Sequence, residues 1–168
     1  MCVRPAAKSA WGRSSMPRCW CNGLVLGAVM VANQAQAFCW EEAASNYQIE
    51  PELLQAIAAV ESGYRADAVN HANRNGTRDI GLMQINSIHL SRLLKQGITE
   101  ERLINEPCLS VEVGASILAE FIQRFGYNWT AVGAYNAGTG SGPEREALRM
   151  QYAQKIWAYY EQLVAQRS

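Results

Sequence analysis

The stretch over residues 53–63 constrains the fold most, because its apolar side chains recur at the spacing of an amphipathic helix. Leu53, Ile57 and Glu61 are four residues apart, so all three lie on the face that such a helix buries. A carboxyl group among apolar side chains is hard to ionise, so its pKa rises and it can keep a proton near neutral pH. These properties suit a general acid. The alternative is a last-turn glutamate that turns to solvent or pairs with a cation.

The first 37 residues have the pattern of a secretory signal peptide. Four basic side chains and no acidic ones precede an apolar segment over 23–32, and the small-x-small triplet over 35–37 fits a cleavage site. The apolar segment is short for a membrane span. We expect residues 1–37 to be removed and the protein to work in the periplasm, with no stable membrane anchor after cleavage. An uncleaved anchor helix is the alternative.

Removal of this leader leaves one negatively charged domain over residues 38–168. Its 131 residues are enough for a single hydrophobic core. They carry 11 basic and 15 acidic side chains, a net charge of −4. Because nucleic acid binding depends on basic surfaces, we expect no nucleic acid as a partner.

Two cysteines, Cys39 and Cys108, remain after the leader is removed. An exported chain meets an oxidising compartment, so an even pair predicts one disulfide. It would close a loop of about 70 residues and stabilise the fold by about 4 kcal/mol. Two free thiols are the alternative. Neither these cysteines nor His71 and His89 have the short spacing of a zinc site, so we expect no metal and no cofactor.

Most of the remaining sequence has helical periodicity, which predicts a mainly α fold. Helices are expected over 40–47, 51–62, 85–95, 110–125, 130–136 and 143–166. Tyr152 and Tyr159 continue the apolar stripe of the last helix, and we interpret them as core residues. The segment between Gly63 and Gly81 breaks the pattern, since it is polar and contains an Asn-Gly turn signal at 75–76. A small β-hairpin or an ordered loop is therefore expected there.

Four short segments occur in an order that resembles a known enzyme family. They are Glu-Ser-Gly at 61–63, Asp-Ile-Gly-Leu-Met-Gln-Ile-Asn at 79–86, Cys108, and Ala-Tyr-Asn-Ala-Gly at 134–138. Together, on a small exported helical domain, they resemble lytic transglycosylases of the soluble-lytic-transglycosylase type. The resemblance is greatest to small members associated with type III secretion, type IV pilus and conjugation systems. It implies an α+β lysozyme-like fold, in which a helical domain has the hairpin or loop beside an active-site cleft.

The resemblance implies that Glu61 is catalytic and that peptidoglycan glycan strands are the substrate. In the family, the matching glutamate protonates the glycosidic oxygen between N-acetylmuramic acid and N-acetylglucosamine. It then removes the proton of the muramoyl 6-hydroxyl, so that a 1,6-anhydro ring closes without water. One carboxyl group of raised pKa can do both, because the first proton transfer prepares it for the second.

The resemblance also implies a set of substrate-binding residues: Ser62, Gly81, Met83, Gln84, Asn86, Tyr135 and Asn136. Ser62 would orient the carboxylate of Glu61, and the hydroxyl of Tyr135 would approach it. Met83 would pack against a sugar, while the side-chain amides of the same segment suit N-acetyl and hydroxyl groups. The structural alternatives are a serine bonded to its own backbone and a core tyrosine with a satisfied hydroxyl.

Asp79 follows the expected hairpin and lies 18 residues after Glu61. In a lysozyme, a second carboxylate from the small β region stabilises the positive charge that develops on the sugar. We hypothesise that Asp79 is a second catalytic residue that assists the charged transition state. The alternatives are an aspartate that caps the next helix or pairs with Arg74 or Arg78.

Three functions follow from these features. The first is a lyase that cleaves peptidoglycan and opens the wall locally for a secretion, pilus or conjugation apparatus. The second is a muramidase-type hydrolase that uses water with Glu61 and Asp79. The third is a non-catalytic wall-binding or assembly protein. Product analysis separates the first two, because a lyase leaves anhydro ends and a hydrolase leaves reducing ends.

Overall fold

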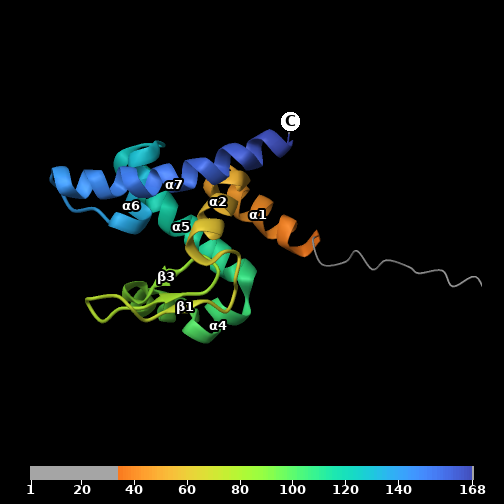
Figure 1. Cartoon of the computed structure of the whole chain (residues 1–168). Helices are drawn as coiled ribbons and strands as arrows, with labels where there is room; N and C mark the ends of the chain where they lie inside the picture. Colours follow the sequence, from red (N-terminus) through yellow and green to blue (C-terminus); the bar gives the residue numbers. More distant parts are fainter. Residues whose placement is uncertain (1–33, 168) are drawn as a thin grey trace, which may run out of the picture. The chain divides into compact units, whose positions relative to one another are not determined.

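The computed structural model describes residues 34–167, which form seven α-helices and a small sheet (Figure 1). The elements are α1 (Gln34–Tyr47), α2 (Pro51–Ser62), β1 (Val69–Asn70), β2 (Asp79–Ile80), β3 (Ile85–Asn86), η1 (Ser87–His89), α3 (Leu90–Leu93), η2 (Leu94–Gln96), α4 (Glu100–Asn105), α5 (Pro107–Phe125), α6 (Trp129–Ala137) and α7 (Pro143–Arg167). The expected mainly α fold with a small β lobe is confirmed.

The signal peptide expected over 1–37 falls almost wholly outside the described residues. Of the helices in the described part, none is long and apolar enough to cross a membrane.

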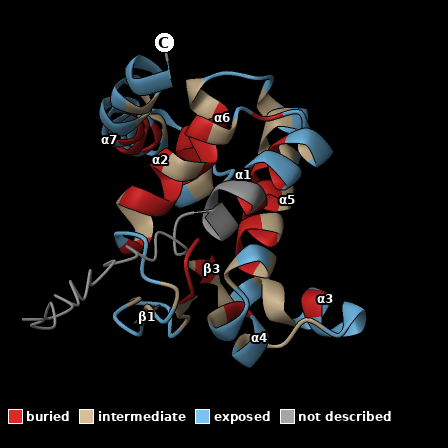
Figure 2. Cartoon of the chain, turned by 90° about the vertical axis from the view of Figure 1, so that its right-hand side faces the viewer, coloured by how far each residue is buried: buried red, intermediate tan, exposed pale blue. Residues whose placement is uncertain are grey.

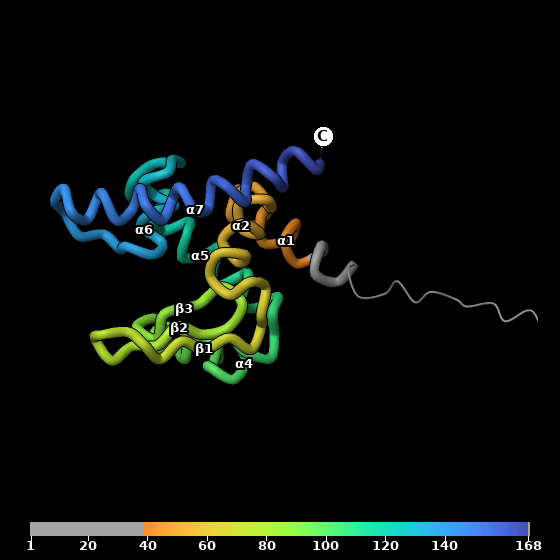
Figure 3. Tube along the Cα trace, viewed as in Figure 1, coloured from red at the N-terminus to blue at the C-terminus, as the bar shows by residue number. Residues whose placement is uncertain are grey.

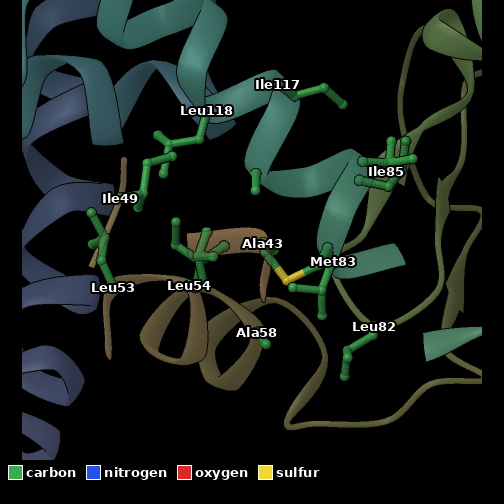
Figure 4. Packing of buried hydrophobic residues seen from close by; sticks show 14 of the residues in the cluster. Ala43, Ile49, Leu53, Leu54, Ala58, Leu82, Met83, Ile85, Ile117 and Leu118 are labelled. Carbon is green, nitrogen blue, oxygen red and sulfur yellow. The ribbon is translucent and has the colours of Figure 1, made fainter. Parts of the chain in front are cut away.

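Helix α2 lies in the hydrophobic core, as its periodicity predicts. Leu54 and Ile57 are fully buried, and Figure 4 shows Leu54 in one cluster with Leu118 of α5. Buried residues gather on the inner faces of α2, α5 and α7 (Figure 2). Gly63, with a φ of 61°, adopts the left-handed conformation that ends α2. The helix therefore holds Glu61 in its last turn, where the chain leaves the core.

The three strands form an antiparallel sheet in the order β1-β2-β3. Val69 pairs with Ile80, and Ile80 pairs with Ile85. The Asn-Gly pair at 75–76 lies in the turn between β1 and β2, where Gly76 has a φ of 75°, so the expected hairpin is confirmed. Figure 3 shows this sheet lobe together with α4 on one side of the helices. Ile80 and Ile85 are buried, which anchors the lobe to the core.

The helix predicted over 85–95 is wrong at its start. Ile85 and Asn86 form β3, and the chain then continues as three short helical segments over 87–96. Asn86 begins the first of them, because its side-chain oxygen accepts a hydrogen bond from the amide of Ile88 at 3.1 Å. Helix α4 was not expected at all. Local periodicity cannot reveal a strand of two residues, since its pairing partner lies elsewhere in the chain.

The expected disulfide between Cys39 and Cys108 is confirmed. It joins α1 to the first turn of α5, with 5.2 Å between the two Cα atoms and a separation of 69 positions in sequence. The loop that it closes contains α2 and the whole sheet lobe.

Helices α6 and α7 are in close contact at Gly133. A Cβ there would lie 2.7 Å from the carbonyl carbon of Arg149 and closer still to its carbonyl oxygen. We expect Gly133→Ala to lower the free energy of unfolding by about 2 kcal/mol, because the two helices must move apart. Urea unfolding measures this loss. The matched control is Gly140→Ala, where the nearest atom belongs to the flexible side chain of Arg145 at 3.4 Å. An equal loss in both variants would contradict the prediction.

Candidate active site

A cleft of about 640 Å³ is lined by residues of the sheet lobe and of α2, α5, α6 and α7. Six of the expected site residues line it: Glu61, Asp79, Gln84, Asn86, Tyr135 and Asn136. Ser62, Gly81 and Met83 lie behind this lining. The fold therefore brings segments more than 70 residues apart in sequence to one site.

Glu61 is one of two carboxyl groups that line this cleft. The hydroxyl of Tyr152 donates a hydrogen bond to its Oε1 atom at 2.6 Å. Burial raises the pKa of Glu61 to about 7; Asp79 adds to the rise, whereas Tyr152 and Lys155 oppose it. The raised pKa expected from the helical pattern is thus confirmed. A carboxyl group with this pKa can donate a proton near neutral pH and afterwards accept one.

Tyr152 on α7 is a site residue that the sequence analysis missed. Its side chain is only 5% exposed, in agreement with the interpretation of a core residue. Its hydroxyl nevertheless reaches Glu61 and donates a hydrogen bond to Oε1. No motif marks this tyrosine. The one available signal was that a buried tyrosine hydroxyl needs a hydrogen-bond partner.

We expect Tyr152→Phe to lower kcat/KM about tenfold and to move the basic limb of the pH profile to higher pH. The hydroxyl stabilises the ionised form of Glu61, so its loss raises the pKa of that carboxyl group further. A pH profile of kcat/KM measures the shift. The control is Tyr159→Phe on the same helix, because Tyr159 is exposed and its interpretation as a core residue is wrong. An unmoved profile, or one displaced to lower pH, would contradict the assignment.

Hydroxyl groups from three helices hold the segment between β2 and β3. Ser62 on α2 donates to the carbonyl oxygen of Leu82 at 2.7 Å. Ser110 on α5 accepts from the amide of Met83 at 3.2 Å. Tyr135 on α6 donates to the carbonyl oxygen of Met83 at 2.9 Å. These bonds fix the sheet lobe against the helices and so fix the width of the cleft.

The structure differs from the role expected for the hydroxyl of Ser62, whereas Tyr135 lies close enough to Glu61 for that carboxylate to add to the rise that burial causes in the pKa of the tyrosine. The hydroxyl of Ser62 donates to backbone carbonyl oxygens of α2 and of the segment between β2 and β3, and not to the carboxylate of Glu61. This is the alternative in which the serine bonds to the backbone. Tyr135 lines the cleft, but its hydroxyl bonds to Met83. The tyrosine that donates to Glu61 is Tyr152. Sequence order could not distinguish the two tyrosines, because α6 and α7 both pass beside the cleft.

Met83 and Gly81 support the cleft from behind. Met83 is fully buried against Gly114 of α5, so the expected packing of its side chain against a sugar is wrong. Gly81 has a φ of 73°, and a Cβ there would lie 2.5 Å from the carbonyl oxygen of Leu103. Only glycine fits at this position, in agreement with the expectation that it gives the backbone room.

The three amide side chains of the cleft differ in how far they are free to bind a ligand. Gln84 donates from its amide nitrogen to the carbonyl oxygens of Ala68 and Gly81 at 3.0 and 2.8 Å. The amide nitrogen of Asn86 is likewise bonded within the sheet lobe. Asn136 is exposed and has no side-chain hydrogen bond to any described residue. Its amide is therefore available to an N-acetyl group or a hydroxyl group.

Asp79 is fixed at the wall of the cleft by three asparagine side chains. Their amide nitrogens lie 3.2, 2.9 and 2.7 Å from its carboxylate oxygens and belong, in that order, to Asn70, Asn73 and Asn86. Arg78, one of the partners considered from sequence, pairs with Glu100 instead. Asp79 thus faces the cavity that Glu61 also faces, and its negative charge raises the pKa of Glu61.

Eight further residues line the cleft, and three of them are basic: Arg74, His89 and Arg145. Burial lowers the pKa of His89, and the positive charge of Arg92 lowers it further. Within residues 34–167, no three His, Cys, Asp or Glu side chains are placed to hold a metal ion.

A carboxylic acid of raised pKa, in a cleft between a helical domain and a small sheet, defines the lysozyme-like class of enzymes. The fold agrees. An inactive mutant of the lytic transglycosylase Slt from Pseudomonas aeruginosa matches 80% of this chain with a TM-score of 0.58 and 23% sequence identity. This chain covers only 24% of that protein. The expected lysozyme-like fold is confirmed.

The chain belongs to the transglycosylase SLT domain family, whose sequence profile matches residues 38–160. It is 53% identical over 131 residues to the invasion protein IagB of Salmonella typhimurium. The aligned region covers 78% of this chain and 80% of IagB. It is 45% identical over 136 residues to the protein IpgF of Shigella flexneri. Here the aligned region covers 81% of this chain and 88% of IpgF. The expected enzyme class, a lytic transglycosylase, is confirmed.

Proposed function

We propose that this enzyme cleaves the β-1,4 bond between N-acetylmuramic acid and N-acetylglucosamine in peptidoglycan and releases a 1,6-anhydro-muramoyl product. The observation that carries the proposal is Glu61, a single acid with a pKa of about 7 that opens onto the cleft. Membership of the SLT family supports peptidoglycan as the substrate.

The reaction needs two proton transfers by the same carboxyl group. Glu61 first gives its proton to the glycosidic oxygen, and the bond from that oxygen to C1 of the muramoyl ring breaks. Positive charge develops at C1. The muramoyl 6-hydroxyl oxygen then bonds to C1 and returns its proton to Glu61, so no water is consumed. Tyr152 holds Oε1 throughout, which keeps Oε2 directed at the substrate.

The predicted signal peptide and the relatives support a role outside the cytoplasm. One relative is named an invasion protein, which supports local opening of the wall for a secretion, pilus or conjugation machine. A component of such a machine is then the expected partner.

The deciding experiment is the incubation of the mature protein with purified sacculi, followed by mass spectrometry of the released muropeptides. Anhydro ends are expected. Reducing ends would favour the hydrolase, and wall binding without any released sugar would favour a non-catalytic assembly protein. Glu61→Gln is the control that links the products to this site.

The hydrolase is the second candidate, because Asp79 lines the same cavity as Glu61. A second carboxylate there could stabilise positive charge at C1 in either reaction. Its three asparagine partners hold it in one position, which is typical of a preorganised group.

We expect Asp79→Asn to lower kcat on sacculi about a hundredfold, because the negative charge that stabilises the transition state is removed. Initial rates of muropeptide release measure the effect, and thermal melting checks that the sheet lobe stays folded. Asp67→Asn, an exposed position before β1, is the control. Unchanged turnover would show that Asp79 has only an architectural role.

A further inference from the structure

Two arginines line the cleft without a carboxylate partner. In the described part of the chain, five other arginines pair with a glutamate: Arg78, Arg92, Arg102, Arg149 and Arg167. Arg74 has no hydrogen bond or ion pair to any described residue. Arg145 donates from Nη1 to the carbonyl oxygen of Ala137 at 2.9 Å, and no described carboxylate pairs with it. Both charges are thus unneutralised within the enzyme.

These two guanidinium groups come from different elements of the fold. Arg74 lies in the turn between β1 and β2, and Arg145 lies in the first turn of α7. Figure 1 shows that this turn and the start of α7 extend to the same side of the molecule. The described charges that act on Glu61 are those of Asp79 and Lys155. Neither arginine is among them.

The glycan backbone of peptidoglycan gives these cations nothing to pair with, because its N-acetylated sugars are neutral. The anions of the polymer are the carboxylates of the peptide stems, which the muramoyl residues carry on their lactyl groups. A guanidinium group offers a planar pair of donors that matches a carboxylate. In a protein whose domain has a net charge of −4, two unpaired cations in the substrate cleft oppose the overall charge.

We propose that Arg74 and Arg145 bind the carboxylates of the peptide stems, so that the enzyme selects glycan strands with charged stems over strands with neutral stems. This inference rests on the proposed cleavage of peptidoglycan. It assigns the cleft a second recognition task, separate from the chemistry at Glu61.

The test compares native sacculi with sacculi whose stem carboxylates have been converted to amides by carbodiimide coupling with ammonia. The wild-type enzyme is expected to release muropeptides from native sacculi about tenfold faster. The difference should shrink at high salt, since exposed ion pairs are screened. Equal rates on the two substrates would overturn the inference and leave the proposed function intact. Inactivity on both would instead overturn the proposed function.

Variants assign the preference to the two arginines. Arg74→Gln is expected to lower the rate on native sacculi about threefold and leave the rate on amidated sacculi unchanged. The double variant with Arg145→Gln should lose the preference altogether. Arg74 makes no bond within the described protein, so its replacement tests recognition alone. The control is Lys95→Gln, which removes an exposed cation in η2, away from the cleft lining. A preference that persists in the double variant would overturn the inference.

Discussion

Replacement of Glu61 by Gln is expected to lower kcat on sacculi by at least about a thousandfold. An amide can neither give a proton to the glycosidic oxygen nor take one from the muramoyl 6-hydroxyl. The substitution preserves size, and a side-chain carbonyl oxygen can still accept the hydrogen bond from Tyr152. Rates of muropeptide release measure the loss, while binding to sacculi should be retained.

The same variant has a stability signature that separates a buried acid from a surface one. The pKa of Glu61 is raised in the folded state, so its contribution to stability is fully present below pH about 4.5 and is lost as pH rises through about 7. A pKa shift of this size corresponds to a change of about 3 kcal/mol in the free energy of unfolding. Glu61→Gln should therefore be more stable than the wild type at pH 8, and the difference should vanish near pH 4. A constant difference across this range would contradict the raised pKa.

Loss of the disulfide is expected to have the largest effect on stability. Replacement of Cys39 and Cys108 by Ala should lower the free energy of unfolding by about 4 kcal/mol, because the unfolded chain is released from a loop of about 70 residues. For a domain of this size, the melting temperature should fall on the order of 15 °C. Calorimetry or circular dichroism at pH 7 measures the change.

Reduction of the wild-type protein is the matched control for the disulfide. A reducing agent should lower the melting temperature of the wild type to that of the double variant and leave the double variant unchanged. If the double variant had the same melting temperature as the oxidised wild type, α1 would be held by its packing on α2 and α5 alone.

Local sequence determined those parts of the site that depend on one element. The period of α2 placed Glu61 on a buried face, and burial is what raises its pKa. The Asn-Gly pair marked the turn of the hairpin, where Gly76 adopts a positive φ. Two cysteines after the predicted signal peptide were enough to predict their pairing. Family motifs then placed Gln84, Tyr135 and Asn136 in the cleft, where they lie.

Only the tertiary structure decided which side chains meet across elements. Tyr152 is a core residue by its spacing, and it becomes the partner of Glu61 because α7 packs against the end of α2. Met83 turns into the core because Gly114 on α5 leaves room for its side chain. Ile85 and Asn86 become a strand through pairing with β2. A helical or alternating pattern specifies the face that is buried, whereas the identity of the neighbour on that face depends on how distant segments pack.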